Sequence, residues 1–218
     1  MPALADYRSD LDALLATAVD SSTWTTAIKD EGLRQALKLV DERLVYETTF
    51  TVTSTGYSQD LSGVTGLNEI REVAYPWTDG ADWYALCVRW RYVDDQTIYF
   101  EDVEPQEDEK IRLRHTKVHT IENLDSAAST TLPGTLDRAL AYGAGAIALR
   151  LRLRQMGENP AIADHAVATY RVLIGEWTQE FDRRLRRYQP GRNPNWNEIG
   201  MENRRYRRDG RWPGGHLG

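Results

Sequence analysis

Four histidines and one cysteine are the side chains of this sequence best suited to metal binding or nucleophilic catalysis. His115 and His119 are four residues apart in a segment with strand character, where such residues share a face about 13 Å apart. This spacing is too long for two ligands of one metal, so an exposed strand face is the favoured interpretation. Cys87 lies among aromatic residues without a neighbouring base, which is typical of a small buried hydrophobic residue.

Carboxylates are dense between Asp94 and Glu109. Held in a cleft, such residues could perform acid–base catalysis, but residues 104–109 are expected at the tip of a hairpin between strands over 97–103 and 110–118. A solvated tip is the favoured interpretation, and an acidic surface that repels a polyanion is an alternative. The sequence also contains no G-x-S-x-G, P-loop or G-x-G-x-x-G motif. We therefore expect no enzymatic activity, no catalytic residue, no metal and no cofactor.

The end of the chain has a different charge from the rest. Residues 181–218 hold ten Arg, no Lys and four acidic residues, a net charge of +6, whereas residues 1–180 hold 17 basic and 29 acidic residues, a net charge of −12. Apolar residues are interleaved with the arginines of the tail. The candidate partner-binding residues are Arg192, Trp196, Ile199, Met201, Arg204, Arg205, Tyr206, Arg207, Arg208, Arg211 and Trp212.

Two kinds of partner fit this tail. Arginine and aromatic side chains can bind single-stranded nucleic acid through phosphate contacts and stacking, and the same residue types anchor protein interfaces. The tail from residue 189 contains three Pro and six Gly, so it cannot build a core of its own. A disordered terminus is poor in Trp and Ile, and arginine pairs with carboxylates as readily as with phosphates. A protein partner is therefore favoured over nucleic acid.

The composition is that of a globular protein. The chain has 218 residues, of which 41% are hydrophobic and 28% are charged, so one domain or one domain with a modest insertion is expected. A single cysteine excludes a disulfide framework. No apolar run approaches the roughly 20 residues of a membrane span, and the first thirty residues show no signal-peptide pattern. A soluble protein without a membrane partner is expected.

Apolar residues at three- and four-residue spacing predict four helices. They cover residues 4–18, 23–44, 132–156 and 161–188. Ser22 or Thr23 is expected to cap the second helix, with Trp24 in its first turn. Gly143 and Gly145 belong to a small-residue stretch that would let another helix approach closely.

Residues between these helix pairs favour β-structure. β-branched and aromatic residues predict about six strands, over 45–54, 57–61, 67–77, 83–93, 97–103 and 110–118. Of these, Trp83–Val93 has the strongest strand character, with its side chains alternating between two faces.

The predicted fold class is α+β, a helical bundle of about four helices with an inserted antiparallel β lobe and an extended C-terminal tail. Its parts are the N-terminal helices at 1–44, the lobe at 45–125, the C-terminal helices at 132–188 and the tail at 189–218.

This order of elements resembles that of the head-to-tail adaptor proteins, also called connector or neck proteins, of tailed bacteriophages. The segments that carry the resemblance are DLSGVTGLNEIREVAY, IYFEDVEPQEDEKIRLRHTKVHTI and LPGTLDRALAYGAGAIALRLRL. The last two are the most specific, because an acidic segment of the form YF-E…E-K-I-R-L is followed by Leu-Pro and a helix rich in Ala and Leu. The resemblance spans roughly residues 10–188.

The resemblance implies a structural virion protein made in the host cytoplasm and located in the neck between capsid and tail. Such adaptors form homo-oligomeric rings, commonly of twelve copies, that dock on the portal protein through the C-terminal segment and contact the next tail or neck protein. Double-stranded DNA passes through the ring without specific binding. Two alternatives are another neck or tail-completion protein and a nucleic-acid-binding module that uses the tail.

Overall fold

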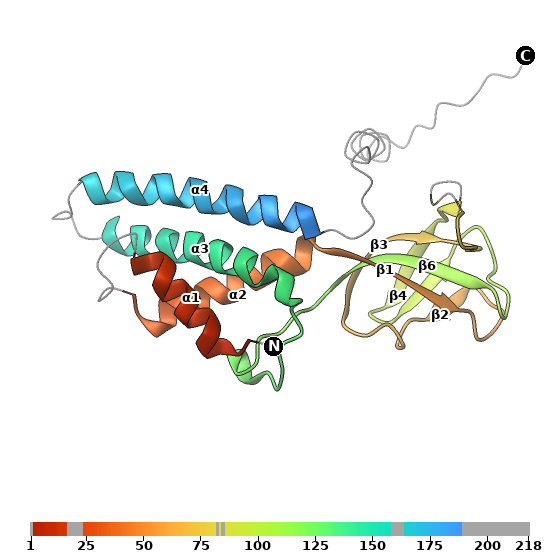
Figure 1. Ribbon diagram of the computed structural model, residues 1–218. Coiled ribbons are helices and arrows are strands. Elements are labelled where there is room, and N and C mark those ends of the chain that lie inside the picture. The colour runs from red at the N-terminus through yellow and green to blue at the C-terminus, as the bar shows by residue number, and fades with distance from the viewer. Residues whose placement is uncertain (1, 17–23, 82, 84–85, 158–163, 189–218) are drawn as a thin grey trace, which may run out of the picture. The chain divides into compact units, whose positions relative to one another are not determined.

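Four helices form in the segments where the sequence predicts them (Figure 1). The computed structural model describes residues 2–16, 24–81, 83, 86–157 and 164–188. The helices are α1 (Leu4–Ala16), α2 (Thr26–Arg43), α3 (Asp137–Gly157) and α4 (Asp164–Tyr188). Short 3-10 turns at Leu124–Ser126 and Gly134–Leu136 precede α3.

The predicted cap of α2 is wrong by two or three residues. Thr25 caps the helix, because its side-chain oxygen accepts a hydrogen bond from the Ile28 backbone N–H at 3.4 Å. Trp24 therefore precedes the helix instead of lying in its first turn, and its side chain is buried. Ser22 and Thr23 lie outside the described residues.

Helix α3 is the centre of the bundle and contacts α1, α2 and α4. Between residues 139 and 149 it has no polar side chain except that of Tyr142, and every other residue of this stretch is buried. A helix that is apolar on all sides needs neighbours on all sides. Glycines at the contacts allow the close approach that the small-residue stretch predicts. A Cβ atom on Gly143 would lie 2.9 Å from the Phe181 ring, and one on Gly145 would lie 2.9 Å from the Trp177 ring.

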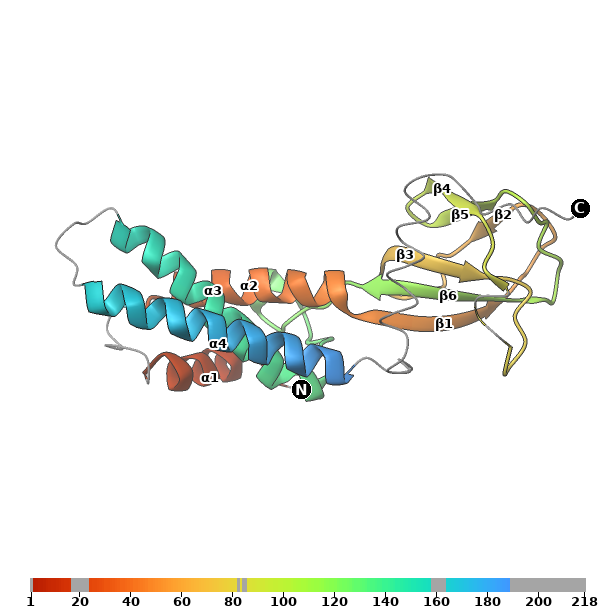
Figure 2. The ribbon, with the colours of Figure 1, turned by 90° about the horizontal axis from the view of Figure 1, so that it is seen from above.

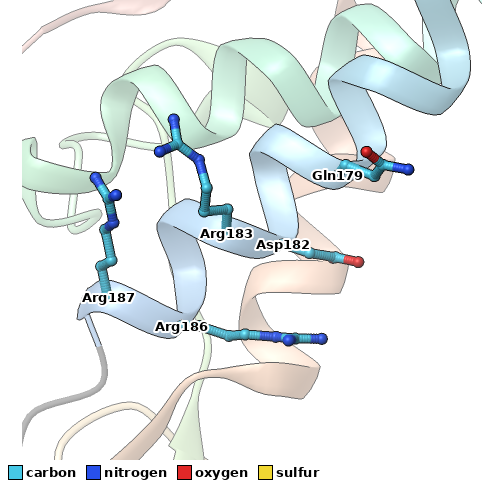
Figure 3. A pocket seen from close by; sticks show the side chains of 5 residues that line it. All are labelled: Gln179, Asp182, Arg183, Arg186 and Arg187. Atoms are coloured by element: carbon cyan, nitrogen blue, oxygen red, sulfur yellow. The ribbon is translucent and has the colours of Figure 1, made fainter.

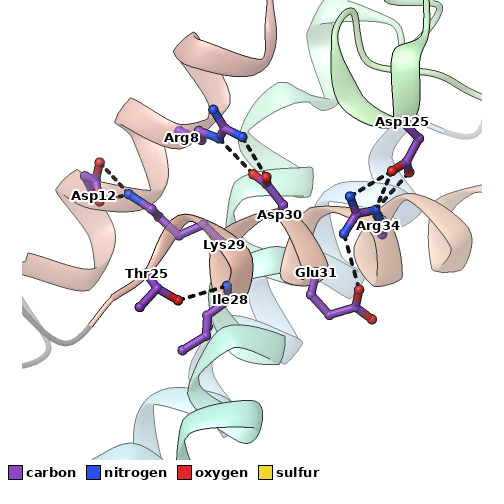
Figure 4. A network of polar contacts seen from close by, with 9 residues as sticks. All are labelled: Arg8, Asp12, Thr25, Ile28, Lys29, Asp30, Glu31, Arg34 and Asp125. Carbon is purple, nitrogen blue, oxygen red and sulfur yellow. Dashed lines mark hydrogen bonds and ion pairs between the residues drawn. The ribbon is translucent and has the colours of Figure 1, made fainter.

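Ion pairs join α1 to α2 (Figure 4). The Arg8 guanidinium donates to both oxygens of Asp30, at 2.8 and 2.6 Å, and Lys29 Nζ lies 2.8 Å from Asp12 Oδ1. The apolar side of α1 packs on α3, where the Tyr7 hydroxyl donates to Asp137 at 2.6 Å. The direction of α1 is thus fixed by both neighbours.

Within the described residues, six strands form two three-stranded antiparallel sheets (Figure 2). The first has the order β1 (Val45–Thr51), β6 (Lys110–Lys117) and β3 (Leu67–Ala74). The second has the order β2 (Ser58–Asp60), β5 (Thr97–Phe100) and β4 (Trp90–Asp94). Inward side chains of both sheets share one core, which includes Ile98 and Phe100 of β5 and Ile111 and Leu113 of β6.

The predicted hairpin of the β lobe is wrong. Segments 97–103 and 110–118 do not form a hairpin, because β5 and β6 belong to different sheets. The acidic segment between them instead joins the end of β1, where Val52 N–H donates to Glu109 O at 2.8 Å and Asp108 N–H donates to Val52 O at 3.0 Å. The strand predicted over 57–61 forms as β2 and pairs with β5. Non-local pairing of this kind leaves no signal in the local sequence.

The segment with the strongest predicted strand character is only partly a strand. In the described residues it becomes regular at Trp90, and before that Cys87 makes an isolated bridge with Ala74. The reason lies in Trp83, which is 4% exposed and has its ring centroid 5.5 Å from that of Trp77. Burying this indole outweighs the β-propensity of the segment, because propensity is a weak preference that packing overrides.

The structure confirms the α+β class, with a four-helix bundle and an antiparallel β lobe. Two hydrophobic cores exist, one within the bundle and one between the sheets. The predicted tail at 189–218 lies outside the described residues. Among the helices that the structure describes, none has both the length and the apolar character that crossing a membrane requires.

Candidate docking site at the end of the last helix

Helix α4 is the described element that leads into the predicted partner-binding tail. All eleven candidate residues, from Arg192 to Trp212, lie beyond Tyr188 and therefore outside the described residues. The part of the docking site that the structure describes is therefore α4 together with the helices that pack against it.

Four buried side chains fix α4 on the bundle. Tyr170, Trp177, Phe181 and Leu185 are each at most 7% exposed and follow one another at spacings of seven, four and four residues. Such spacing places them on one face of a helix. Because Trp177 and Phe181 lie directly over the glycines of α3, α4 approaches α3 closely and has little freedom to rotate.

The last turns of α4 present a basic surface (Figure 3). Five residues line an open hollow there: Gln179, Asp182, Arg183, Arg186 and Arg187. In Figure 3, Arg183 and Arg187 point toward the bundle side of this face, and Gln179, Asp182 and Arg186 point toward the right of the view. Cations at this position also interact favourably with the negative end of the helix dipole.

The acidic residues of this region are engaged by some of the arginines. Glu180 accepts hydrogen bonds from Arg183 Nε at 2.7 Å and Arg184 Nε at 2.6 Å. The hydrogen bond from Arg183 is the main reason that the pKa of Glu180 is lowered. Asp182 pairs with Arg43 of α2 at 2.6 Å. Arg186 and Arg187 have no carboxylate within 4 Å in the part of the chain that the structure describes.

The prediction that His115 and His119 lie on an exposed strand face is wrong, because both are buried. His115 Nε2 is 2.9 Å from Thr48 Oγ1, and its Nδ1 donates to the Thr116 carbonyl at 3.2 Å. These hydrogen bonds give both ring nitrogens of buried His115 a polar partner at the point where β6 pairs with β1.

His119 does not share the partners of His115 and lies where the β lobe joins α2. Its Nδ1 is 2.7 Å from Asp41 Oδ1, and its Nε2 is 2.8 Å from the Tyr46 hydroxyl. The two histidines therefore have separate polar partners. Over the described ranges, no group of three or more His, Cys, Asp or Glu side chains could hold a metal ion.

Stability is expected to fall as the pH drops through the ordinary pKa of histidine, which is 6.5. Burial lowers the pKa of His115, so the folded state keeps the ring neutral while the unfolded state takes up a proton. His115 thus contributes stability that is present above this pH and is lost below it. His115→Gln should show a shallower dependence of the urea midpoint on pH. Equal slopes for the variant and the wild type would contradict this assignment.

The carboxylates between Asp94 and Glu109 do not converge on a cleft. Asp94 and Asp95 are exposed at a turn, where Asp94 Oδ1 accepts a hydrogen bond from Gln96 N at 2.8 Å. Asp102 pairs with Arg89 at the surface. These acids are solvated, as predicted, although the segment is not a hairpin. Cys87 is half-buried beside β3.

Sequence reasoning missed an arginine–tryptophan cluster on the outer face of the first sheet. The guanidiniums of Arg112 and Arg114 lie over the rings of Trp77 and Trp83, at 4.6 and 4.1 Å. Both arginines also pair with Glu47. Burial raises the pKa of Glu47, but the hydrogen bonds from these arginines outweigh that effect and the pKa is lowered overall. Alternating cations on β6 opposite an acid on β1 are the signal that could have indicated this cluster.

Comparisons with known proteins give a structural likeness. No protein-family model matches the chain, and no curated protein matches it. Among solved structures, the chain is similar to a chain from the neck of an empty GTA particle, a structure computed with C6 symmetry. The two are 18% identical, the match covers 79% of this chain and 86% of that chain, and the TM-score is 0.27.

Proposed function

We propose that this protein is a structural component of the neck of a phage-like particle. In this role it forms a ring that docks on the portal, contacts the next tail or neck protein and continues the DNA channel. The observation that carries the proposal is the element order, with two helices, six strands and two helices preceding a tail rich in arginine and tryptophan. That order is the one that the sequence resemblance to head-to-tail adaptors leads us to expect.

The proposed function requires docking and not catalysis. Helix α4 is held firmly by four buried side chains, so a partner bound to the tail is connected to a rigid bundle. The tail supplies Arg, Trp, Ile and Met side chains, which are suited to a groove on another protein. The net charge of −12 over residues 1–180 favours a channel through which DNA passes without specific binding.

Deletion of Pro190–Gly218 is expected to leave a folded protein that no longer binds the portal protein of the same particle. Residues 2–188 contain both hydrophobic cores, so the urea midpoint should change little. Pull-down on immobilised portal measures the loss. A matched full-length variant, Trp196→Ala with Trp212→Ala, keeps every arginine and should weaken portal binding by about tenfold or more. Portal binding retained by the truncated protein would contradict the proposal.

Nucleic-acid binding through the same tail is the competing function, because ten arginines lie between residues 181 and 218. It predicts affinity for single-stranded DNA that weakens steeply with salt. A filter-binding titration at two salt concentrations tests this alternative. Tight, salt-sensitive binding together with no affinity for portal would favour it over the docking function.

A further inference from the structure

Arginines in the described part of the chain have two kinds of surroundings. Among the eight that precede α3, seven pair with a carboxylate: Arg8, Arg34, Arg43, Arg71, Arg89, Arg112 and Arg114. The eighth, Arg91, lies over the Tyr99 ring. Helices α3 and α4 carry nine arginines, of which only Arg183 and Arg184 form an ion pair with another described residue, both with Glu180.

Seven arginines of the two C-terminal helices therefore have no carboxylate within 4 Å among the described residues. They are Arg138, Arg150, Arg152, Arg154, Arg171, Arg186 and Arg187. The chain carries a net negative charge and pairs most of its other arginines with its own carboxylates. The seven arginines without such a partner therefore form a basic surface that an acidic partner could contact.

The outward face of α4 carries small side chains as well as arginines. Exposed residues follow one another at steps of four, three and four residues, at Ala168, Val172, Gly175 and Gln179. Val172 is 59% exposed, and a Cβ atom on Gly175 would meet no atom within 4 Å. Arg171 lies beside this face next to Val172, and Arg186 continues the face toward the C-terminal end of α4. Small side chains with arginines beside them suit the close approach of another helix that carries acids.

Helix α1 has a face with the complementary character. Its exposed residues include Ala5, Ser9 and Ala13 at steps of four, with Asp6 and Asp10 beside them. Neither aspartate has a cation within 4 Å in the described ranges, whereas Asp12 on the side toward α2 pairs with Lys29. This face of α1 therefore combines small side chains with aspartates, whereas that of α4 combines small side chains with arginines.

The two faces belong to different sides of one bundle. Helices α1 and α4 each pack against α3 with their apolar sides, so their exposed sides point away from it. A contact between these faces consequently needs a second copy of the chain. Contacts that join unlike faces of identical chains generate closed rings when the rotation closes.

We infer that the outward face of α4 in one copy docks on the outward face of α1 in the next, with Arg171 and Arg186 directed at the acidic face that carries Asp6 and Asp10. The inference rests on the proposed function, because a ring requires such an interface between copies. A second copy is favoured over DNA because exposed Val172 lies on this face, and an apolar side chain can be buried against another protein but offers a phosphate no contact.

Charge reversal with rescue tests the interface on the full-length chain. Asp6→Lys with Asp10→Lys, or Arg171→Glu with Arg186→Glu, should each raise the concentration needed for self-assembly by about tenfold or more. A chain that carries all four substitutions should again assemble at the wild-type concentration. Asp94→Lys with Asp95→Lys adds the same charge to the β lobe as the α1 variant adds to α1, and should leave assembly unchanged. Sedimentation velocity, alone and with portal rings, measures the oligomer.

Three outcomes would overturn the inference. If the α1 and α4 variants assemble like the wild type while rings still form, the ring uses another interface and the proposed function is unaffected. If the wild type stays monomeric both alone and on portal, the inference and the ring fail together. If the α4 variant instead loses salt-sensitive DNA binding and keeps its oligomeric state, the outward face of α4 binds DNA and not a second copy.

A disulfide test gives a second readout that does not depend on charge. In a Cys87→Ser background, Ser9→Cys together with Gln179→Cys, which lies midway between Arg171 and Arg186, should give a ladder of covalent multimers on oxidation, because each copy is joined to two neighbours. Either cysteine alone should give no product larger than a dimer. A double-cysteine chain that also stops at dimers would contradict the α1-to-α4 contact.

Discussion

Phe181→Ala is expected to lower the free energy of unfolding by about 3–5 kcal/mol. The side chain is 2% exposed, and its ring lies over Gly143, which has no side chain to fill the space that the ring would leave. Urea unfolding followed by circular dichroism measures the loss. Val118→Ala is the matched control, because Val118 is 52% exposed and its truncation should change stability by no more than about 0.5 kcal/mol.

A double-mutant cycle shows whether the effect arises from this contact. Gly143→Ala alone should be destabilising, because the added Cβ would lie 2.9 Å from the Phe181 ring and 3.3 Å from Ala36 Cβ. In the Phe181→Ala background the ring is absent, so the same substitution should cost less. A coupling free energy of about 0.5–3 kcal/mol is expected for residues in direct contact. Strict additivity of the two changes would contradict the described packing.

Glycine-to-alanine substitutions in α2 and α4 should have opposite signs. Gly32→Ala is expected to destabilise the protein by about 1–3 kcal/mol, because its Cβ would lie 2.7 Å from the Ala144 carbonyl oxygen, a backbone atom that cannot turn away. Gly175→Ala should stabilise it by about 0.5–1 kcal/mol, because nothing lies within 4 Å and alanine is the better helix former. Urea midpoints at equal protein concentration provide the comparison. Stabilisation by Gly32→Ala would contradict the close packing of α2 on α3.

The helices could be predicted from the sequence because their signals are local. The apolar spacing of Tyr170, Trp177, Phe181 and Leu185 identifies the buried face of α4, and all four are buried. The position of α3 at the centre of the bundle was less evident, although its continuous apolar run is the pattern of a helix covered on all sides. Thr25 was missed as the cap because several neighbouring hydroxyl residues are equally suitable by type.

The sheets could be predicted only in outline. Strand segments were recognisable from β-branched residues, but β1 pairs with β6 across a gap of about sixty residues, and no local pattern contains that information. His115 was assigned to a solvated face because histidine is polar, whereas its position opposite Tyr46 in the register places it inside. For the candidate site, the sequence indicated the basic tail, and it did not show that seven of the nine arginines of α3 and α4 lack a carboxylate partner among the described residues.

The pairing of β1 with β6 has a consequence for the order in which the protein can fold during synthesis. Helices α1 and α2 leave the ribosome about one hundred residues before α3, which supplies the surface that their apolar sides cover. Until then they remain exposed to non-native association, as incompletely folded chains are. Closure of β6 on β1 joins the residues after α2 to those before α3, which shortens the loop that separates the two helices and lowers the entropic cost of their meeting. We therefore expect the lobe to form before the bundle is complete, and a chain with a defective lobe to bind chaperones through its exposed N-terminal helices.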